Sequence, residues 1–502
     1  MKRIIGRIIS IAPALCIQAL WYAAIFSWLK PHQGIIDIIL SILSFLFVLY
    51  VITKRDEGTY KTLWLLIILS LPLLGAFLYL CYGNKRTAKP LGEKLKRAKQ
   101  DMPSMLDDSS DFQKLEQQNK RVSQTFHYLQ NKTGLPVIKN QNATYYPVGE
   151  KMFEAMLCDL KKAKKYIFVE YFIVEEGKFF NSLIDIMEEK VTQGVDVRIM
   201  YDDFGSLTTY SFRNLKKLKE KGIRCIPFNP LIFLRGTLNN RDHRKMLIID
   251  GEVAFTGGVN LADEYINEVK RFGHWKDIGL RLEGPAVKNY VYMFSEFWNA
   301  FSTEKVPKEY ISRIVLKSEK KDGYVLSYYD SPVQKDAVSN NLYIELLSQA
   351  TKYAYFYTPY LMLGDTLMDA FVRAAQRGVD IRIIMPGIPD KKIVFRLSRS
   401  YYSVLMEAGI KIYEYTPGFV HAKGCVIDGV LGTIGTVNLD YRSLFLHFEN
   451  NSLFYQASIL KDLEEDFLAT QEKSHEVTRK DMRHGVLYEI FNGILRIFAP
   501  LC

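Results

Sequence analysis

Two stretches of the chain follow one pattern. Residues 243–260 read HRKMLIIDGEVAFTGGVN and residues 421–438 read HAKGCVIDGVLGTIGTVN. Each has a His, a Lys two residues later, an Asp five residues after that, and a small-residue turn that ends in Asn. Because side chains alternate along a strand, the His and Lys of each stretch project to the same face. The doubled pattern predicts that two imidazoles and two ammonium groups meet, a combination suited to chemistry on a phosphate diester.

The pattern supplies the candidate site residues. The candidate catalytic residues are the His, Lys and Asp of each copy: His243, Lys245, Asp250, His421, Lys423 and Asp428. The candidate substrate-binding residues are the small residues and Asn of each turn: Gly257, Gly258, Asn260, Gly435, Thr436 and Asn438. Strand alternation turns each Asp away from the pocket, so its expected role is structural, at a strand end or turn.

The roles follow from the chemistry of each side chain. A neutral imidazole can attack phosphorus, and a covalent phospho-enzyme divides one difficult displacement into two easier ones. A second imidazole can protonate the departing alcohol and deprotonate the next one. The two lysines would stabilise charge on the nonbridging oxygens. No cluster has the spacing of a metal site, and the lysines would repel a divalent cation, so we expect no metal and no cofactor.

Sequences on either side of the motif also repeat. The stretch 163–174 aligns with 350–361, and 194–200 aligns with 378–384. Within each half, β-branched and aromatic runs alternate with amphipathic stretches that stop at a glycine. We therefore expect an α/β fold with mostly parallel sheets, built as two domains related by a pseudo-twofold axis, with both motifs at their shared face.

The N-terminal region is apolar. Residues 8–29, 38–53 and 63–82 are long apolar segments, which predict two to three transmembrane helices within residues 1–83. A cleaved signal peptide is the alternative for the first segment, but no small-x-small cleavage site is evident and further apolar segments follow. The basic residues after the third segment favour a multi-pass cell-membrane protein with cytoplasmic catalytic domains.

The remaining boundaries follow from composition. We expect a basic linker over 84–135, a first domain over 136–310, and a second domain over 320–502. The second domain ends in an amphipathic helix, which could pack on the domain or lie on a membrane surface. The net charge of +11 indicates an anionic partner, nucleic acid or membrane. Six scattered cysteines exclude a disulfide framework and fit a reducing compartment.

The doubled motif resembles the signature of the phospholipase D superfamily, and other segments resemble bacterial cardiolipin synthases. These are LPLLGAFLYLCYGNKR (71–86), YDDFGS (201–206), HWKDIGLRLEGPAV (274–287), MPGIPDKKIV (385–394) and NLDYRSLFLHFENN (438–451). The resemblance implies tandem phospholipase D-like domains behind N-terminal transmembrane helices. An apolar segment before residue 30 is additional to the family's usual two spans, and GTVN replaces GGVN in the second motif.

The resemblance also implies a reaction. Two phosphatidylglycerols would give cardiolipin and glycerol through a phosphatidyl-histidine, with His243 as the favoured nucleophile and His421 as acid and base. The implied partners are phosphatidylglycerol, cardiolipin and an anionic bilayer, and no nucleic acid. The alternatives are a phospholipase D-type hydrolase, which differs only in using water for the second step, and a membrane-tethered phosphodiesterase or nuclease.

Overall fold

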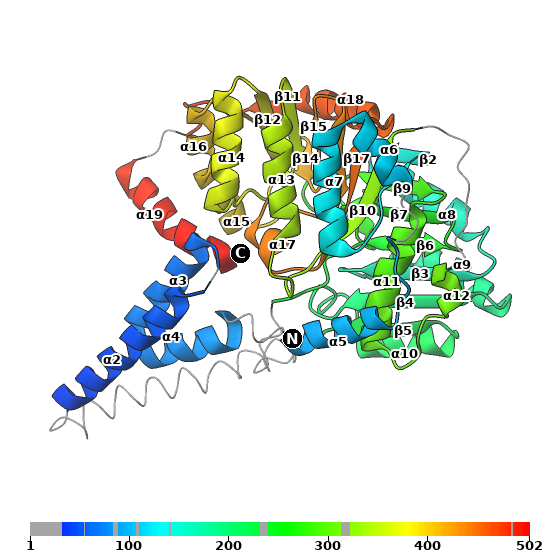
Figure 1. The fold of residues 1–502 in the computed structure, drawn as a ribbon, viewed down its shortest axis with the longest axis horizontal. Helices are drawn as coiled ribbons and strands as arrows, with labels where there is room; N and C mark the ends of the chain where they lie inside the picture. The colour runs from blue at the N-terminus through cyan, green and yellow to red at the C-terminus, as the bar shows by residue number, and fades with distance from the viewer. Residues whose placement is uncertain are drawn as a thin grey trace.

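The computed structural model describes most of the chain. The described residues are 33–54, 56–83, 89–106, 110–139, 142–230, 239–312, 322–482 and 485–501. The predicted apolar span over 8–29 lies outside them, and so does most of the expected domain boundary between 310 and 320. Within the described part, two sheets with helices on their outer faces form the main body (Figure 1).

The first half contains a seven-stranded sheet in the order β2–β9–β7–β6–β3–β4–β5. Its strands are β2 (Asn142–Tyr146), β3 (Tyr166–Tyr171), β4 (Asp196–Asp202), β5 (Arg224–Phe228), β6 (Met246–Ile249), β7 (Val253–Gly257) and β9 (Gly279–Glu283). The helices of this half are α8 (Gly149–Leu160), α9 (Lys178–Thr192), α10 (Phe212–Glu220), the short η5 (Asp263–Ile266), α11 (Val287–Phe301) and α12 (Lys308–Ser312).

The second half contains a nine-stranded sheet in the order β1–β10–β17–β16–β15–β11–β12–β13–β18. Its strands are β1 (Ile138–Lys139), β10 (Tyr324–Asp330), β11 (Tyr353–Tyr357), β12 (Asp380–Pro386), β13 (Lys411–Tyr415), β15 (Gly424–Ile427), β16 (Leu431–Gly435), β17 (Glu449–Tyr455) and β18 (Ser474–Glu476). Its helices are α13 (Val338–Gln349), α14 (Asp365–Gln376), α15 (Lys392–Ser400), α16 (Tyr402–Glu407), α17 (Tyr441–Phe445) and α18 (Ile459–Gln471).

The expectation of mostly parallel sheets is wrong. Only β3–β4–β5 in the first sheet and β11–β12–β13 in the second are parallel, and the other pairings within both sheets are antiparallel. The motif itself is the reason. Each copy forms a tight hairpin, β6–β7 or β15–β16, and the second strand of a hairpin necessarily runs antiparallel to the first.

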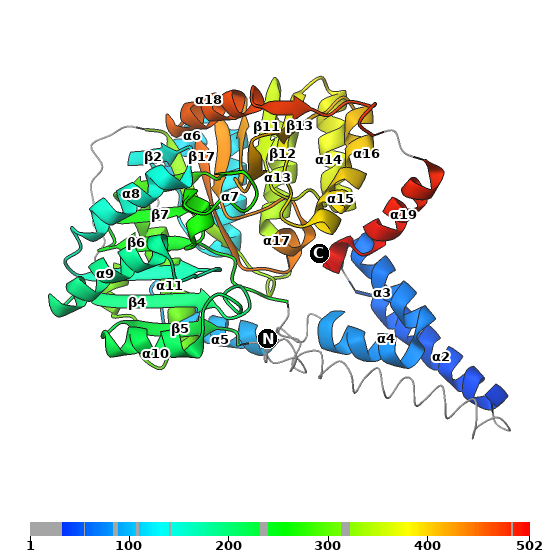
Figure 2. The ribbon, with the colours of Figure 1, turned by 180° about the vertical axis from the view of Figure 1, so that it is seen from behind.

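The two halves share one interior. Helix α11 packs against strands of both sheets, and α18 contacts β2 of the first half and β15 of the second. A two-stranded parallel sheet also joins the halves, from β8 (His274–Lys276) and β14 (Gly418–Val420). Seen from behind, α18 lies across the upper edge of both halves (Figure 2). The predicted pair of repeated units is therefore joined at its centre.

Residues 89–133, expected to be a linker, form three helices. They are α5 (Lys89–Gln100), α6 (Ser110–Gln118) and α7 (Lys120–Thr133). Helix α5 packs on α11 of the first half, whereas α7 packs on α13 and β10 of the second. Strand β1, placed by the sequence in the first domain, pairs with β10 in the sheet of the second half. This segment thus contacts both halves.

The predicted N-terminal transmembrane helices are not confirmed. Among the residues that the structure describes, no helix is long and apolar enough to cross a membrane. The segment 38–53 falls largely within α2 (Gln33–Ile52). The segment 63–82 is divided between α3 (Gly58–Ser70), α4 (Pro72–Leu78) and η2 (Tyr79–Gly83). The break between α3 and α4 lies at Leu71, which precedes Pro72 and has non-helical dihedrals.

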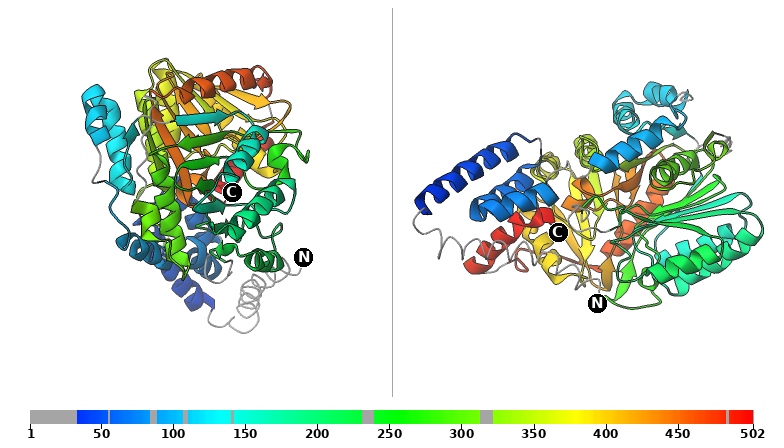
Figure 3. Two further views of the ribbon diagram at one scale, coloured as in Figure 1. Left: turned by 90° about the vertical axis from the view of Figure 1, so that its right-hand side faces the viewer. Right: turned by 90° about the horizontal axis from the view of Figure 1, so that it is seen from below.

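These N-terminal helices project from the main body and meet it at α17 (Figures 1 and 3). The ring of Tyr60 stacks on that of Tyr441, with centroids 5.9 Å apart. The outward faces are apolar, and on α2 the exposed large side chains include Ile35, Ile38, Ile39, Ile42, Leu43, Phe45, Leu46 and Leu49. The side of α3 that carries Tyr60 therefore packs against α17 of the second half.

The C-terminal segment forms α19 (Val486–Ile497), followed by η6 (Ala499–Leu501). Helix α19 packs on α15 and touches α3. The guanidinium of Arg396 lies 4.3 Å from the centre of the Phe491 ring, and Nε of Arg396 donates to Oδ1 of Asn492. Other side chains of α19, including Ile490 and Ile494, are exposed. The helix thus packs on the second half and also presents apolar side chains outward.

Arg244, which lies between the His and Lys of the first motif, allows the contribution of buried ion pairs to stability to be tested. Its guanidinium is fully buried and pairs with Glu170 and Asp242. Replacing it with Ala leaves two buried carboxylates without their counter-charge, so we expect Arg244→Ala to lower the free energy of unfolding by about 3–5 kcal/mol. Arg224→Ala, which removes a half-exposed arginine from its pairs with Asp196 and Glu304, should cost less than about 1 kcal/mol.

Chemical denaturation of the two purified variants in detergent, followed by circular dichroism, provides the comparison. Equal losses of stability would show that the buried network around Arg244 does not stabilise the core.

Candidate active site

Each motif places its histidine immediately before a buried hairpin. The His and Lys of the first copy precede β6, and those of the second precede β15. Asp250 and Asp428 occupy the hairpin turns with φ of 55° and 52°, values that Asp tolerates better than most residues. The repeated sequence therefore folds into the same local structure twice.

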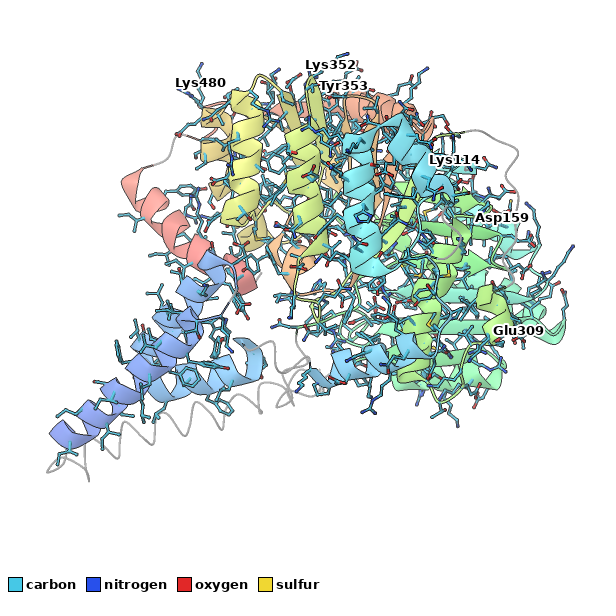
Figure 4. The ribbon with its side chains drawn as sticks, in the orientation of Figure 1. Lys114, Asp159, Glu309, Lys352, Tyr353 and Lys480 are labelled. Carbon is cyan, nitrogen blue, oxygen red and sulfur yellow. The ribbon has the colours of Figure 1, made fainter. Side chains whose placement is uncertain are left out.

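The two motif aspartates have a structural role, because each binds backbone N–H groups at the start of a neighbouring strand. The carboxylate of Asp250 accepts hydrogen bonds from the backbone N–H groups of Lys164, Lys165 and Tyr166, at 2.7–2.8 Å. Asp428 does the same at the start of β11, where Lys352 and Tyr353 lie at the outer edge of the second half (Figure 4). The structure does not bring either aspartate to the cavity that holds the histidines.

That cavity lies where the halves meet and has a volume of about 230 Å³. Both His243 and His421 line it, together with Asn260 and Asn438. The other lining residues are Phe172, Ile173, Phe204, Arg241, Tyr265, Trp275, Tyr360, Met362, Asp390, Lys391, Val394, Phe419, Asp440, Arg442, Ser443 and His447. One composite cavity therefore receives residues from both repeats.

Each motif histidine is held by a carboxylate from the other half. Nδ1 of His243 lies 2.9 Å from Oε1 of Glu449, and Nδ1 of His421 lies 2.8 Å from Oδ2 of Asp277. With Nδ1 directed at a carboxylate, Nε2 of each ring is the nitrogen left for chemistry. Neither histidine is fully oriented without the partner half.

Burial disfavours the charged forms of these pairs. It lowers the pKa of both histidines well below the ordinary value, and the nearby lysines of both motifs add to the shift. Burial also raises the pKa of Glu449, and it raises that of Asp277 to about 7. A neutral imidazole has the free lone pair that a nucleophile or a general base needs.

The motif lysines lie beside the histidines but are not part of the cavity wall. Nζ of Lys245 donates to the backbone carbonyl of His243 at 2.7 Å, and Lys423 donates in the same way to the carbonyl of His421. Both side chains are buried, and burial lowers the pKa of Lys245 to about 8 and that of Lys423 to about 7. Their charge at neutral pH is therefore sensitive to what occupies the cavity.

In the first motif, the small residues leave room for the supporting carboxylate. A Cβ on Gly258 would lie 2.0 Å from Oδ1 of Asp277, and Gly257 has a φ of +145°. Asn260 lines the cavity, where its side chain accepts from the N–H of Ile173 and donates to the hydroxyl of Tyr265. Of Gly257, Gly258 and Asn260, only Asn260 lines the cavity.

The second motif departs from the first at Thr436. Its hydroxyl donates to Oε2 of Glu449 at 2.5 Å and so holds the carboxylate that supports His243. A Cβ on Gly435 would meet the backbone of Asn450. Asn438 lines the cavity and donates to Asp440, while its Oδ1 has no partner among the described residues. Thr in place of Gly is thus a supporting residue and not a substrate contact.

Comparison with known proteins agrees with this geometry. The family described as "Cardiolipin synthase, PLD-like domain" matches residues 156–298 and 343–470, one segment in each half. The family described as "Phospholipase D-nuclease N-terminal" matches residues 39–84. The chain belongs to the cardiolipin synthase family.

Curated relatives extend over most of the chain. A protein named cardiolipin synthase from Alkalihalophilus pseudofirmus is 32% identical, covering 97% of this chain and 98% of its own. Cardiolipin synthase 2 of Bacillus anthracis is 34% identical over 90% of this chain and 88% of its own. An uncharacterised protein of Streptococcus mutans is 42% identical over 90% of this chain and 99% of its own.

Among solved structures, phosphatidylserine synthase from Haemophilus influenzae superposes with a TM-score of 0.57. The two chains are 16% identical, and the match covers 75% of this chain and 97% of the other. At that identity the similarity shows the fold alone.

Sequence reasoning did not single out the residues that support the histidines. Asp277, Glu449 and His447 lie inside segments noted for their family resemblance, but no role was assigned to them. The signal that the sequence offers is an acidic residue beside a buried strand, because a buried carboxylate needs a hydrogen-bonding partner. Its partner, however, lies in the other half and is revealed only by the assembled fold.

His243, His447 and Glu449 offer ligand atoms within 4.8 Å of one another, a spacing that a metal ion could use. The surrounding charge is positive, since Lys245 and Arg442 lie close by, and Glu449 is already held by His243 and Thr436. Because fixed positive charge opposes a divalent cation, we expect extensive EDTA dialysis to leave cardiolipin synthase activity unchanged. Loss of activity that Zn²⁺ restores would assign these residues to a metal site.

The lysine pKa shifts predict a pH profile. A lysine with a lowered pKa is charged below that pKa and neutral above it, so stabilisation of phosphate oxygens should disappear as the pH rises. We expect kcat/KM to fall on the alkaline side with an apparent pKa between about 7 and 8, the values for Lys423 and Lys245. A profile that stays flat up to the range of an exposed lysine would contradict this assignment; circular dichroism over the same range controls for unfolding.

Proposed function

We propose that this chain is a phosphatidyltransferase that joins two phosphatidylglycerols into cardiolipin and releases glycerol. The observation that carries the proposal is the crossed pairing of His243 with Glu449 and of His421 with Asp277 around one cavity. Two oriented imidazoles can serve as nucleophile and as acid and base for one phosphodiester. The family matches in both halves support the same reaction.

The first step forms a covalent intermediate. Nε2 of His243 attacks the phosphorus of one phosphatidylglycerol, and the bond between phosphorus and the glycerol oxygen breaks. The anionic phosphodiester in the cavity favours the protonated form of His421, which donates its Nε2 proton to the departing glycerol. The positive charges of Lys245 and Lys423 stabilise the oxygens of the pentacoordinate transition state. The products are a phosphatidyl-histidine and free glycerol.

The second step reverses these roles. His421, now neutral, removes a proton from the terminal hydroxyl of a second phosphatidylglycerol. The resulting oxygen attacks phosphorus, and the bond between phosphorus and His243 breaks. One phosphodiester replaces another, so the energy of the bond is retained and no nucleotide is needed. Asn260 and Asn438 lie in the cavity wall, where they can bind phosphate or glycerol oxygens.

The size of the cavity indicates which part of the lipid enters. About 230 Å³ accommodates headgroup atoms and leaves the acyl chains outside. Apolar side chains are exposed on the projecting helix α2 and on α19, and α19 packs on α15, which carries the cavity residue Val394. We propose that these helices hold the catalytic part at an anionic cell membrane, on its cytoplasmic side. The net charge of +11 favours such a surface.

The hydrolase and nuclease alternatives share both motifs and differ in what accepts the phosphatidyl group. A hydrolase would use water and release phosphatidic acid, and a nuclease would cleave DNA. Purified protein in phosphatidylglycerol vesicles distinguishes them by the products that accumulate. Phosphatidic acid or cleaved DNA in place of cardiolipin would refute the synthase proposal.

Both histidines line the same cavity and each has its own role in the reaction, so loss of either should abolish turnover. We expect His243→Ala and His421→Ala each to reduce cardiolipin formation and glycerol release to background, a loss of at least about a thousandfold. The measurement follows radiolabelled phosphatidylglycerol by thin-layer chromatography. His475→Ala, which removes an exposed histidine of β18, is the matched control and should keep wild-type activity. Substantial activity in either motif variant would contradict the composite site.

A further inference from the structure

The cavity wall differs between the two halves at a position that the repeat makes equivalent. Ile173 follows β3 in the first half, and Tyr360 occupies the matching position after β11 in the second. Both residues line the cavity. Phe172, next to Ile173, has its ring centroid 4.9 Å from that of His243. The first half is therefore apolar at this point of the wall, whereas the second half presents a phenolic hydroxyl.

Tyr360 holds a carboxylate at the cavity. Its hydroxyl donates to Oδ2 of Asp390 at 2.7 Å, and Asp390 also lines the cavity. Burial and the charge of Asp390 raise the pKa of Tyr360 well above its ordinary value, so the hydroxyl remains a donor. The two residues follow β11 and β12, which are neighbouring parallel strands. Ligands of α/β sheets bind beyond the carboxyl ends of such strands, so this pair lies where a ligand group is expected.

One oxygen of the Asp390 carboxylate is available to a ligand. Lys391, whose side chain is 64% exposed, has its Nζ 3.6 Å from Oδ2, the oxygen that Tyr360 already binds. Among the residues that the structure describes, no hydrogen-bond donor reaches Oδ1. The other carboxylate of the cavity wall, Asp440, accepts from the backbone N–H of Ser443 and from the amide of Asn438. Asp390 is thus the wall carboxylate with an oxygen that can still accept a hydrogen bond.

The pair of Tyr360 and Asp390 lies on the side of His421. The Phe419 ring contacts both, with its centroid 6.4 Å from that of Tyr360 and 5.9 Å from that of His421. Burial lowers the pKa of His421, and the charges of the motif lysines and of Lys391 add to the shift. In the proposed reaction the alcohol leaves and enters on this side, because His421 exchanges a proton with its oxygen. The other hydroxyls of the alcohol therefore lie near this wall.

A carboxylate is an unusual wall residue for a cavity that binds an anion. Its charge repels phosphate oxygens, whereas it accepts hydrogen bonds from hydroxyl groups. Asp390 therefore marks a part of the wall that faces donors of the substrate and not its phosphate. An ammonium group is the other kind of donor, but Lys391 already brings a positive charge to the same carboxylate. A neutral hydroxyl fits this position better.

We propose that Asp390, held by Tyr360, binds the hydroxyl on the middle carbon of the glycerol unit and so determines which alcohols the enzyme uses. The inference rests on the proposed function, because both the departing glycerol and the acceptor phosphatidylglycerol carry this hydroxyl beside the reacting carbon. In the second step the terminal oxygen of the acceptor bonds to phosphorus, its proton passes to His421, and the bond from phosphorus to His243 breaks. The hydrogen bond to Asp390 aligns that terminal oxygen with phosphorus.

The test uses two isomeric alcohols that differ only in where the second hydroxyl lies. After reaction through a terminal oxygen, 1,2-propanediol keeps a hydroxyl on the middle carbon and 1,3-propanediol does not. The full-length protein, in mixed micelles of phosphatidylglycerol and detergent, receives each radiolabelled diol, and the labelled phospholipid is measured. We expect the kcat/KM of the wild-type protein to favour 1,2-propanediol about tenfold or more, because a hydrogen bond to a charged group is lost with the other isomer.

The variants test the assignment of this preference to Asp390. Asp390→Asn should reduce the preference to within about twofold, mainly by raising the KM for 1,2-propanediol. Tyr360→Phe should reduce it in the same direction, because the carboxylate loses the hydroxyl that holds it, and Asp390→Glu should retain part of it. Asp369→Asn, which neutralises a 70% exposed aspartate of α14, is the charge-matched control and should keep the wild-type preference.

Several results would overturn the proposal. One is a wild-type protein that uses both diols equally, and another is an Asp390→Asn variant that loses both activities equally, as a purely structural role requires. A wild-type preference for ethanolamine over 1,2-propanediol that Asp390→Asn abolishes would assign the site to an ammonium group instead. Thermal unfolding midpoints identify a variant that does not fold, in which case Tyr360→Phe decides. A wild-type protein that makes no cardiolipin would refute the proposed function, whereas cardiolipin formation without diol preference would refute this inference alone.

Discussion

The exchange of carboxylates between the two halves is the interaction on which the site depends. His243 belongs to the first half and is oriented by Glu449 of the second, and His421 is oriented by Asp277 in the opposite sense. Both carboxylates are fully buried in the assembled structure, where water does not reach them, so each depends on the histidine of the other half for a hydrogen-bond partner. Cohesion between the halves and orientation of the histidines therefore have the same physical origin.

The same burial sets the electrostatics. Two lysines, two histidines and two carboxylates share a small volume, and desolvation works against every charge among them. A bound phosphate diester would supply the missing negative charge and return the lysines to their protonated form. The cavity is thus suited to an anion.

Much of this architecture could be predicted from the sequence. The repeat and the meeting of both motifs follow from spacing, and so does the structural role of Asp250 and Asp428. The strand expected to carry the His and Lys of each motif begins only after the lysine. The sequence places Asp250 and Asp428 at a strand end or turn, but it does not reveal that this turn closes a hairpin, whose antiparallel strands make each sheet mixed. The roles of Asp277 and Glu449 could not be predicted, because each acts across an interface formed only by the folded halves. The length of the apolar segment 63–82 predicts a single span, whereas Pro72 interrupts its helix.

The stacking of Tyr60 on Tyr441 joins the N-terminal helices to the second half. Tyr441 immediately precedes Arg442, so one side of α17 is packed against α3 while the adjoining residue lines the cavity. The same N-terminal region also contacts the first half, where the side-chain amide of Asn239 donates to the backbone carbonyl of Tyr82 in η2. A segment outside the duplication thus packs against the helix that carries one wall residue of the cavity, so the two repeats have unlike surroundings.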